Sequence, residues 1–166
     1  GYASQIIDQL PTGLKYKSGN TIISKDAQGI EKNKYAVTYD ESKNRVIFDI
    51  SETKKELNAY LKDNIDKETI EIECEVIAQA SKEKNQILTN VAWINEAYDT
   101  KDNKVVAKLG DDRDSEPQTH PNVNADNMEK YKGNTSNKDE LNDNTYYYEG
   151  EQDDDDFEKI VIPVAE

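Results

Sequence analysis

Two long stretches of this 166-residue chain have patterns typical of β-strands, and in the first of them apolar and polar side chains alternate with a period of two. Successive side chains of a β-strand point to opposite faces, so such alternation predicts strands rather than helices. Residues 69–80 predict a strand with one buried and one solvent-exposed face. Its apolar set is Ile70, Ile72, Cys74, Val76, Ala78 and Ala80, and its polar set is Glu71, Glu73, Glu75 and Gln79. Residues 87–98 are apolar on both faces, which predicts a central strand of a sheet.

Residues 35–40 and 45–50 are two further β-prone runs, and the turn residues 41–44 between them predict a hairpin. Residues 157–164 predict a last strand. In the segment 10–14, Pro11 fixes one backbone angle and Gly13 is free to take a positive φ, so a turn is expected there. Thr53 and Glu56 have the spacing of a capping box, which predicts a short helix over 51–61.

These elements together predict an all-β fold, an antiparallel β-sandwich with one short helix and a long acidic loop. The loop is indicated by the distribution of charge. Residues 110–158 carry 16 acidic and 4 basic side chains, whereas the rest of the chain is nearly neutral. A segment so rich in Asp, Glu and Asn cannot bury enough surface to offset its chain entropy. We therefore expect a β-sandwich core over 1–109, an acidic loop over 110–156 that is either disordered or organised by a cation, and a terminal strand or linker over 157–166.

Composition excludes several classes of function. The formal net charge is −14, so phosphate backbones and anionic lipid surfaces are poor partners, since lysine and arginine must supply those contacts. No run approaches the roughly 20 apolar residues that span a bilayer, so no membrane insertion is expected. A single cysteine and a single histidine exclude zinc clusters and disulfide frameworks by count. Around His120 there is no nucleophile motif and no second histidine, and Cys74 is expected to be a small buried hydrophobe, so we expect no enzyme.

Three segments resemble the conserved-repeat and fimbrial isopeptide-forming immunoglobulin-like domains of Gram-positive surface proteins. Residues 6–16 read IIDQLPTGLKY and are similar to the family's I-x-D-x-L-P-x-G-L-x-Y segment. Residues 87–94 read ILTNVAWI and are similar to its I-x-N-x-A-x-I strand. Residues 112–115, DRDS, and 146–159, YYYEGEQDDDDFEK, resemble its acidic ending.

The resemblance implies an immunoglobulin-like sandwich that is a non-enzymatic segment of an extracellular stalk or adhesin, attached to the cell wall or secreted. Its partners would be neighbouring repeats of the same polypeptide. Family members usually have one or two strands before the D-x-L-P motif, and few residues precede it here. We therefore expect the first strand to be missing, shared with a neighbouring repeat, or supplied by residues 157–164.

The acidic segment is the candidate metal site, because Ca²⁺ takes roughly six to eight oxygen ligands from carboxylates and carbonyls on irregular backbone. The candidate ligands are Asp99, Asp102, Asp112, Asp114, Asp153, Asp154, Asp155 and Asp156. None of these groups matches the EF-hand pattern. The alternative is a solvated, self-repelling loop.

Two further features are candidate sites. Asn90 has the motif position of the asparagine in a Lys–Asn isopeptide bond, which also needs a lysine and a carboxyl group in an apolar core; alternatively, its amide hydrogen-bonds to backbone. The run Tyr146, Tyr147 and Tyr148 is either a platform that stacks on a ligand or a clamp for the acidic loop. The alternative function is therefore an adhesive module that recognises a host matrix protein or a glycan through this loop.

Overall fold

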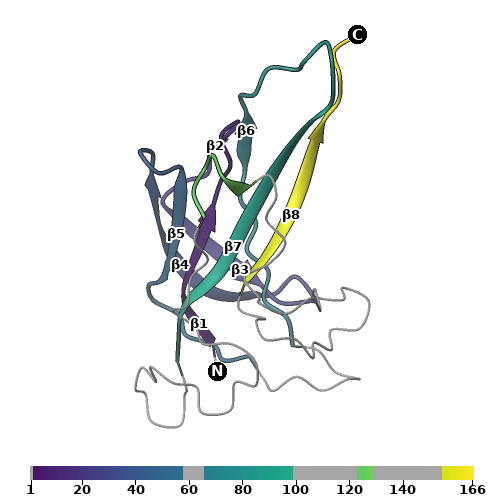
Figure 1. Ribbon diagram of the computed structural model, residues 1–166. Coiled ribbons are helices and arrows are strands. Elements are labelled where there is room, and N and C mark those ends of the chain that lie inside the picture. The colour runs from purple at the N-terminus through teal and green to yellow at the C-terminus, as the bar shows by residue number, and fades with distance from the viewer. Residues whose placement is uncertain (1, 58–65, 99–122, 129–154) are drawn as a thin grey trace, which may run out of the picture.

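The regular elements in the described part of the protein are antiparallel β-strands. The computed structural model describes residues 2–57, 66–98, 123–128 and 155–166 (Figure 1). Its strands are β1 (Tyr2–Gln9), β2 (Leu14–Tyr16), β3 (Thr21–Lys25), β4 (Glu31–Asp40), β5 (Arg45–Ile50), β6 (Cys74–Val76), β7 (Gln86–Tyr98) and β8 (Asp155–Ile162). Six of them form one sheet in the order β3-β4-β5-β1-β7-β8, and β2 pairs with β6 in a second sheet. The predicted all-β antiparallel class is confirmed.

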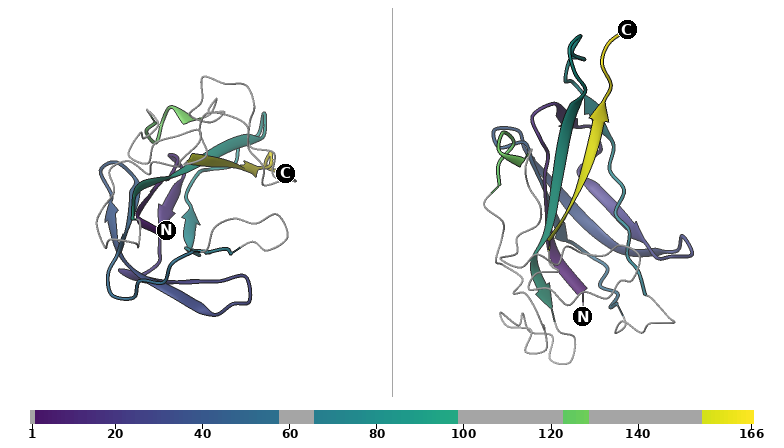
Figure 2. Two further views of the ribbon diagram at one scale, coloured as in Figure 1. Left: turned by 90° about the horizontal axis from the view of Figure 1, so that it is seen from below. Right: turned by 45° about the vertical axis from the view of Figure 1, so that its right-hand side comes forward.

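The larger sheet curls, and the small sheet lies on its concave side (Figure 2). Between the two sheets is a cluster that we call the inner core. Its buried members are Leu10, Leu14, Tyr16, Tyr35, Val37, Val46, Phe48 and Leu88. On the convex side a second cluster, the outer cluster, consists of Ile7, Val91, Trp93, Val123 and Met128. The alternation expected along β7 is confirmed, because Leu88 belongs to the inner core and Trp93 to the outer cluster.

The predicted hairpin forms between β4 and β5, with Asp40 opposite Arg45 next to the turn. Asn44 has a φ of 54° in that turn, a backbone conformation that asparagine tolerates better than most residues. Its side-chain amide donates to the carbonyl oxygens of Pro11 and Leu14, at 2.9 and 3.0 Å. Gly13 takes the expected positive φ, at 114°. The hairpin turn and the predicted turn at 10–14 are therefore joined to each other.

The strand that carries the D-x-L-P motif lies in the middle of the larger sheet. β1 pairs with β5 on one side and with β7 on the other. β8 pairs with β7 and so does not replace a strand beside β1. The expectation that residues 157–164 supply a missing first strand stays a prediction; they form a strand, and its neighbour is β7.

The helix expected over 51–61 is absent from its described part, residues 51–57. The reason is a contact with β4. Asn33 accepts a hydrogen bond from the Lys55 backbone N–H at 2.6 Å and donates one to the Lys55 carbonyl at 3.1 Å. These two bonds take backbone groups that a helix would use internally. Residues 58–61 lie outside the described residues.

The strand expected over 69–80 is only partly formed, as β6 and a single bridge between Lys25 and Thr69. Its predicted apolar face is nevertheless turned toward the inner core, since Ile70, Ile72, Cys74 and Ala78 pack against that core. Val76 and Ala80 are exceptions and are exposed.

A short part of the predicted acidic loop packs on the convex face of the sheet. Val123 and Met128 are buried in the outer cluster. Thr12 donates its backbone N–H to the Ala125 carbonyl at 2.9 Å and its hydroxyl to Asp126 at 2.6 Å. Residues 123–128 are therefore part of the folded unit, and β8 begins at Asp155, inside the expected loop boundary.

Candidate functional site

The inner core contains a buried carboxyl group beside a half-buried carboxamide. Asp8 lies on β1 opposite Ala92 of β7 and Val46 of β5, so it shares their face of the sheet. Asn90 is two residues from Ala92 and points to that same face. The register of β1 against β7 therefore makes Asp8 and Asn90 diagonal neighbours within the inner core.

Both side chains keep one oxygen without a hydrogen bond. Oδ1 of Asp8 and Oδ1 of Asn90 are buried and have no partner among the described residues. Burial raises the pKa of Asp8 to about 6, and the hydrogen bond with the Asn90 side chain opposes that shift. Asp8 is therefore held in the form of a carboxylic acid up to higher pH than an ordinary aspartate.

A buried acid beside an asparagine is the arrangement that the isopeptide prediction requires, but a lysine is also needed. The pKa of Asp8 is influenced by burial and by the hydrogen bond with Asn90, and no lysine contributes to it. The isopeptide bond at Asn90 stays a prediction. It is checked by the intact mass, because bond formation releases one ammonia. The alternative prediction, a hydrogen bond of the Asn90 amide to backbone, does not hold for its buried oxygen.

Cys74 on β6 faces the same interior. The side chain is half-buried, and burial followed by the negative charge of Asp8 raises the pKa of its thiol. A raised pKa disfavours the reactive thiolate. The prediction that Cys74 is a small apolar side chain therefore fits its surroundings, although it is less buried than expected.

A second polar cluster, which the sequence did not indicate, joins three segments at the other end of the inner core. Glu68 accepts hydrogen bonds from Ser24, from the Asn33 amide at 3.0 Å and from the Tyr35 hydroxyl at 3.0 Å. Ser24 and Asn33 are also bonded to each other across the β3–β4 pair. Nearby, Lys32 and Asp66 form a largely buried ion pair at 3.1 Å. These contacts fasten residues 66–69 to the edge of the larger sheet.

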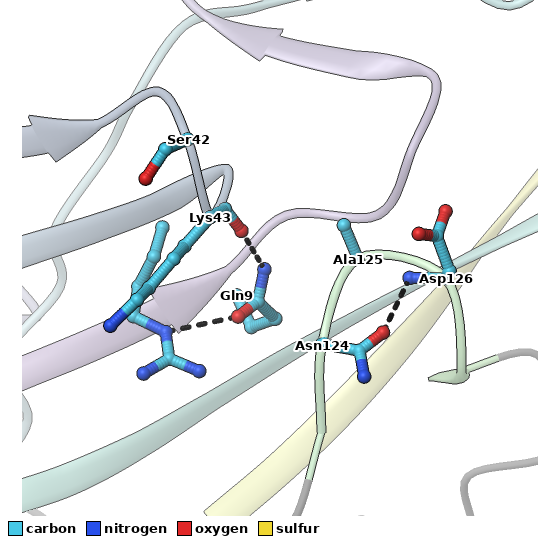
Figure 3. Close-up of a pocket in the computed structure, with 7 residues that line it drawn as sticks. Gln9, Ser42, Lys43, Asn124, Ala125 and Asp126 are labelled. Carbon is cyan, nitrogen blue, oxygen red and sulfur yellow. Dashed lines mark hydrogen bonds between the residues drawn. The ribbon is translucent and has the colours of Figure 1, made fainter.

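A polar pocket of about 430 Å³ lies between the β4–β5 turn and residues 123–128 (Figure 3). It is lined by Gln9, Ser42, Lys43, Arg45, Asn124, Ala125 and Asp126. The Gln9 amide donates to the Lys43 carbonyl at 2.8 Å, and Arg45 donates to Gln9 at 3.0 Å (Figure 3). The Arg45 guanidinium lies 5.3 Å from the centre of the Trp93 ring and donates to the Val123 carbonyl. Gln9 thus holds the β4–β5 turn, and Arg45 links β5 to residues 123–128.

Most of the predicted site residues lie outside the described part of the chain. These are Asp99, Asp102, Asp112, Asp114, Asp153 and Asp154, together with His120 and with Tyr146, Tyr147 and Tyr148. Asp155 and Asp156 begin β8, where their backbones are in register with Trp93 and Ala92. Among the described residues no group of three acidic, histidine or cysteine side chains is arranged to hold a metal ion. The calcium prediction therefore stays a prediction.

Asp8 is the functional candidate that the analysis of the sequence missed. Its signal was present, since Asp8 stands between Ile6 and Leu10 on the apolar face of a strand, and both of these pack in the inner core. An acidic side chain in an apolar row is an exception to the pattern that defines the strand.

In the described part of the chain, no helix is long and apolar enough to cross a membrane. The sequence matches no protein-family model, no curated protein and no solved structure at a significant level.

Proposed function

We propose that the protein is a non-enzymatic structural repeat, a stalk or adhesin segment of a bacterial cell-surface protein with an immunoglobulin-like sandwich fold. One observation carries this proposal. The two ends of the chain lie at opposite ends of the molecule (Figure 1; Figure 2, right). Domains with this arrangement can be joined end to end into an extended array, which is what a stalk requires.

The strands next to the two ends support the same function. β1 and β8 are both antiparallel to β7 and flank it, so they run in the same direction. Tension applied at the start of β1 and at the end of β8 pulls these strands in opposite directions along β7. The β1–β7 ladder runs from the pair Tyr2–Tyr98 to Gln9–Val91, and the β7–β8 ladder from Gln86–Ile162 to Trp93–Asp155. Both ladders are loaded in shear, in which many hydrogen bonds must break together.

Force spectroscopy tests this proposal by comparing two directions of pulling on one domain. The first direction uses the two chain ends. The second uses cysteines introduced as Asn85→Cys and Val164→Cys, which are adjacent because the Val164 N–H donates to Asn85 at 2.8 Å. That pair opens the β7–β8 ladder one bond at a time. Cys74→Ser removes the native thiol from both proteins.

Forced unfolding is governed by the barrier along the pulled direction, so the geometry decides the force. We expect the chain-end geometry to unfold at a clearly higher force than the 85–164 geometry. Equal forces, or a lower force through the chain ends, would remove the mechanical basis of the proposal.

Calcium is part of the proposal as a stabiliser of the acidic segment. A cation that binds only the folded state raises the melting temperature by mass action. A thermal melt in millimolar CaCl₂ against EDTA tests this, with Mg²⁺ as the control for general screening of the −14 net charge. A shift that Mg²⁺ reproduces would leave calcium without a specific role.

The adhesive alternative through Tyr146, Tyr147 and Tyr148 stays a prediction, because no observation on the described residues favours it.

A further inference from the structure

The two sheets leave one side of the inner core incompletely covered. β6 is an end strand of the small sheet, and β8 is an end strand of the larger one. Within the described residues, no strand pairs with the free edge of either. We call the space flanked by these two edges the β6–β8 seam. Unpaired strand edges are templates for pairing with further polypeptide.

Side chains that face the inner core are exposed along the seam. On β7 the inner-facing Leu88 is 8% exposed, whereas Ile160, its cross-strand neighbour on β8, is 38% exposed. Val76 of β6 pairs with the buried Leu14, yet Val76 is 54% exposed. The face of each sheet that points to the inner core is therefore covered away from the seam and exposed at the seam.

The seam is closed at one end. The Ala165 N–H donates to the Ser81 carbonyl at 2.8 Å, which ties the segment after β8 to the segment after β6. The Val164 N–H is bonded to Asn85 in the same region. An occupant of the seam is therefore bounded by two strand edges along its length and by this contact at one end.

The solvent-exposed face of residues 69–80, the segment that contains β6, is acidic. Glu71, Glu73 and Glu75 alternate with the inward-facing residues and are exposed. On β2, Lys15 lies opposite Glu75 of β6, but the Lys15 amine is paired with Glu41 at 3.4 Å. A strand laid along the free edge of β6 would place its outward side chains beside this row of glutamates. Basic side chains are favoured at those positions.

We propose that the β6–β8 seam is a docking site for one extended strand of another polypeptide, in which apolar residues alternate with lysine or arginine. The apolar residues pack on Val76 and Ile160, the basic residues face the glutamates, and the backbone pairs with the edges of β6 and β8. This is the β-augmentation mode of peptide recognition. It does not depend on the proposed function.

Three synthetic peptides test the proposal, each about eight residues long, which is the length of an ordinary strand. In the first, valine alternates with lysine; in the second, valine alternates with threonine; in the third, valine alternates with glutamate. We expect affinity to fall in that order, measured by calorimetry. We also expect the bound lysine peptide to slow amide hydrogen exchange in β6 and β8, and not in the β3–β4 hairpin. N-methylation at every second peptide residue removes the hydrogen bonds to one edge and is expected to abolish binding.

Substitutions in the protein locate the site. Val76→Glu and Ile160→Glu place a charge against the apolar side chains of the peptide, and each is expected to weaken binding of the lysine peptide by about tenfold or more. Ile23→Glu is the matched control, because Ile23 is 42% exposed on β3, the opposite edge of the larger sheet. It is expected to leave the affinity unchanged. All three positions are exposed, and the hydrogen exchange of each free variant shows whether it is folded.

Three results would overturn the proposal. The first is that no peptide binds. The second is binding that survives Val76→Glu and Ile160→Glu, or protection that appears on β3. The third is self-association in sedimentation with protection of β6 and β8 in the absence of peptide, since the occupant would then be a second copy of this chain.

Discussion

The carboxyl group of Asp8 is predicted to cost stability at neutral and alkaline pH, and Asp8→Asn removes that cost. In the unfolded chain the pKa of an aspartate is near 3.8, whereas burial raises it to about 6 in the fold. The folded protein therefore holds an additional proton between these two values. Stability associated with Asp8 is complete below pH 3.8 and is lost as the pH rises through about 6.

The magnitude follows from the size of the shift. One pKa unit corresponds to about 1.4 kcal/mol, so a shift of roughly two units makes the folded state about 3 kcal/mol less stable at pH 8 than with a neutral side chain. At pH 4.5 the same linkage makes the folded state only about 1 kcal/mol less stable than with a neutral side chain. Asparagine has the shape of aspartate without the charge, and its N–H₂ can donate to the unpartnered oxygen of Asn90. We expect Asp8→Asn to stabilise the protein by about 3 kcal/mol at pH 8 and by about 1 kcal/mol at pH 4.5.

Urea unfolding of both proteins at pH 8, 6 and 4.5 measures these differences. The comparison cancels the contribution of the other carboxyl groups, because both proteins carry them. Glu83→Gln, at an exposed position, is the control for removal of one negative charge and is expected to show little change with pH. A gain from Asp8→Asn that stays constant from pH 4.5 to pH 8 would refute the reasoning, because the variant would then act through packing rather than through ionisation. A loss of stability at pH 8 would refute it as well.

Three further substitutions test the packing and the polar contacts. Glu68→Ala removes the acceptor that Ser24, Asn33 and Tyr35 share; because each of these donors also has a backbone carbonyl as acceptor, the free energy of unfolding is expected to fall by about 1 to 2 kcal/mol in urea titrations. Gly13→Ala is expected to cost about 2 kcal/mol, because φ is 114° and a Cβ would lie 3.0 Å from that of Ala78, while Gly19→Ala, in open space, is expected to be nearly neutral. Met128→Ala is expected to cost about 3 kcal/mol and to expose the single tryptophan to solvent, seen as a red shift of its fluorescence.

The strands β4, β5, β7 and β8 were predicted from local patterns of the chain, whereas β1, β2 and β3 were not predicted. The assignment of Leu88 and Trp93 to opposite faces of β7 followed from a period of two and is confirmed. The helix over 51–61 was predicted from an equally local signal and is absent from residues 51–57, its described part. Its backbone groups are taken by Asn33, a residue on β4 that no pattern within 51–61 can reveal. Local propensity was overridden by a tertiary contact.

Of the two members of the candidate site, Asn90 was predicted and Asp8 was missed, and their geometry could not be predicted. Asn90 was identified from its motif position, and Asp8 was visible as an acidic side chain in an apolar row. Their proximity depends on the register of β1 against β7, which pairs Asp8 with Ala92. A register slip of one residue would have moved Asp8 to the opposite face. The Glu68 cluster was out of reach for the same reason, because it combines side chains of β3 and β4 with a segment that lies far along the chain.

The titration of Asp8 and the β6–β8 seam are physically connected. Asp8 acts on the pKa of Cys74 of β6, and Asn90, its hydrogen-bonding neighbour, is in register with Glu158 of β8. Asp8 therefore faces the same interior as residues of the two strands that flank the seam. A docked strand would remove water from the inner core and raise the cost of the Asp8 carboxylate further. Because the effect of binding on protonation equals the effect of protonation on binding, a neutral Asp8 would bind the strand more tightly than a charged one.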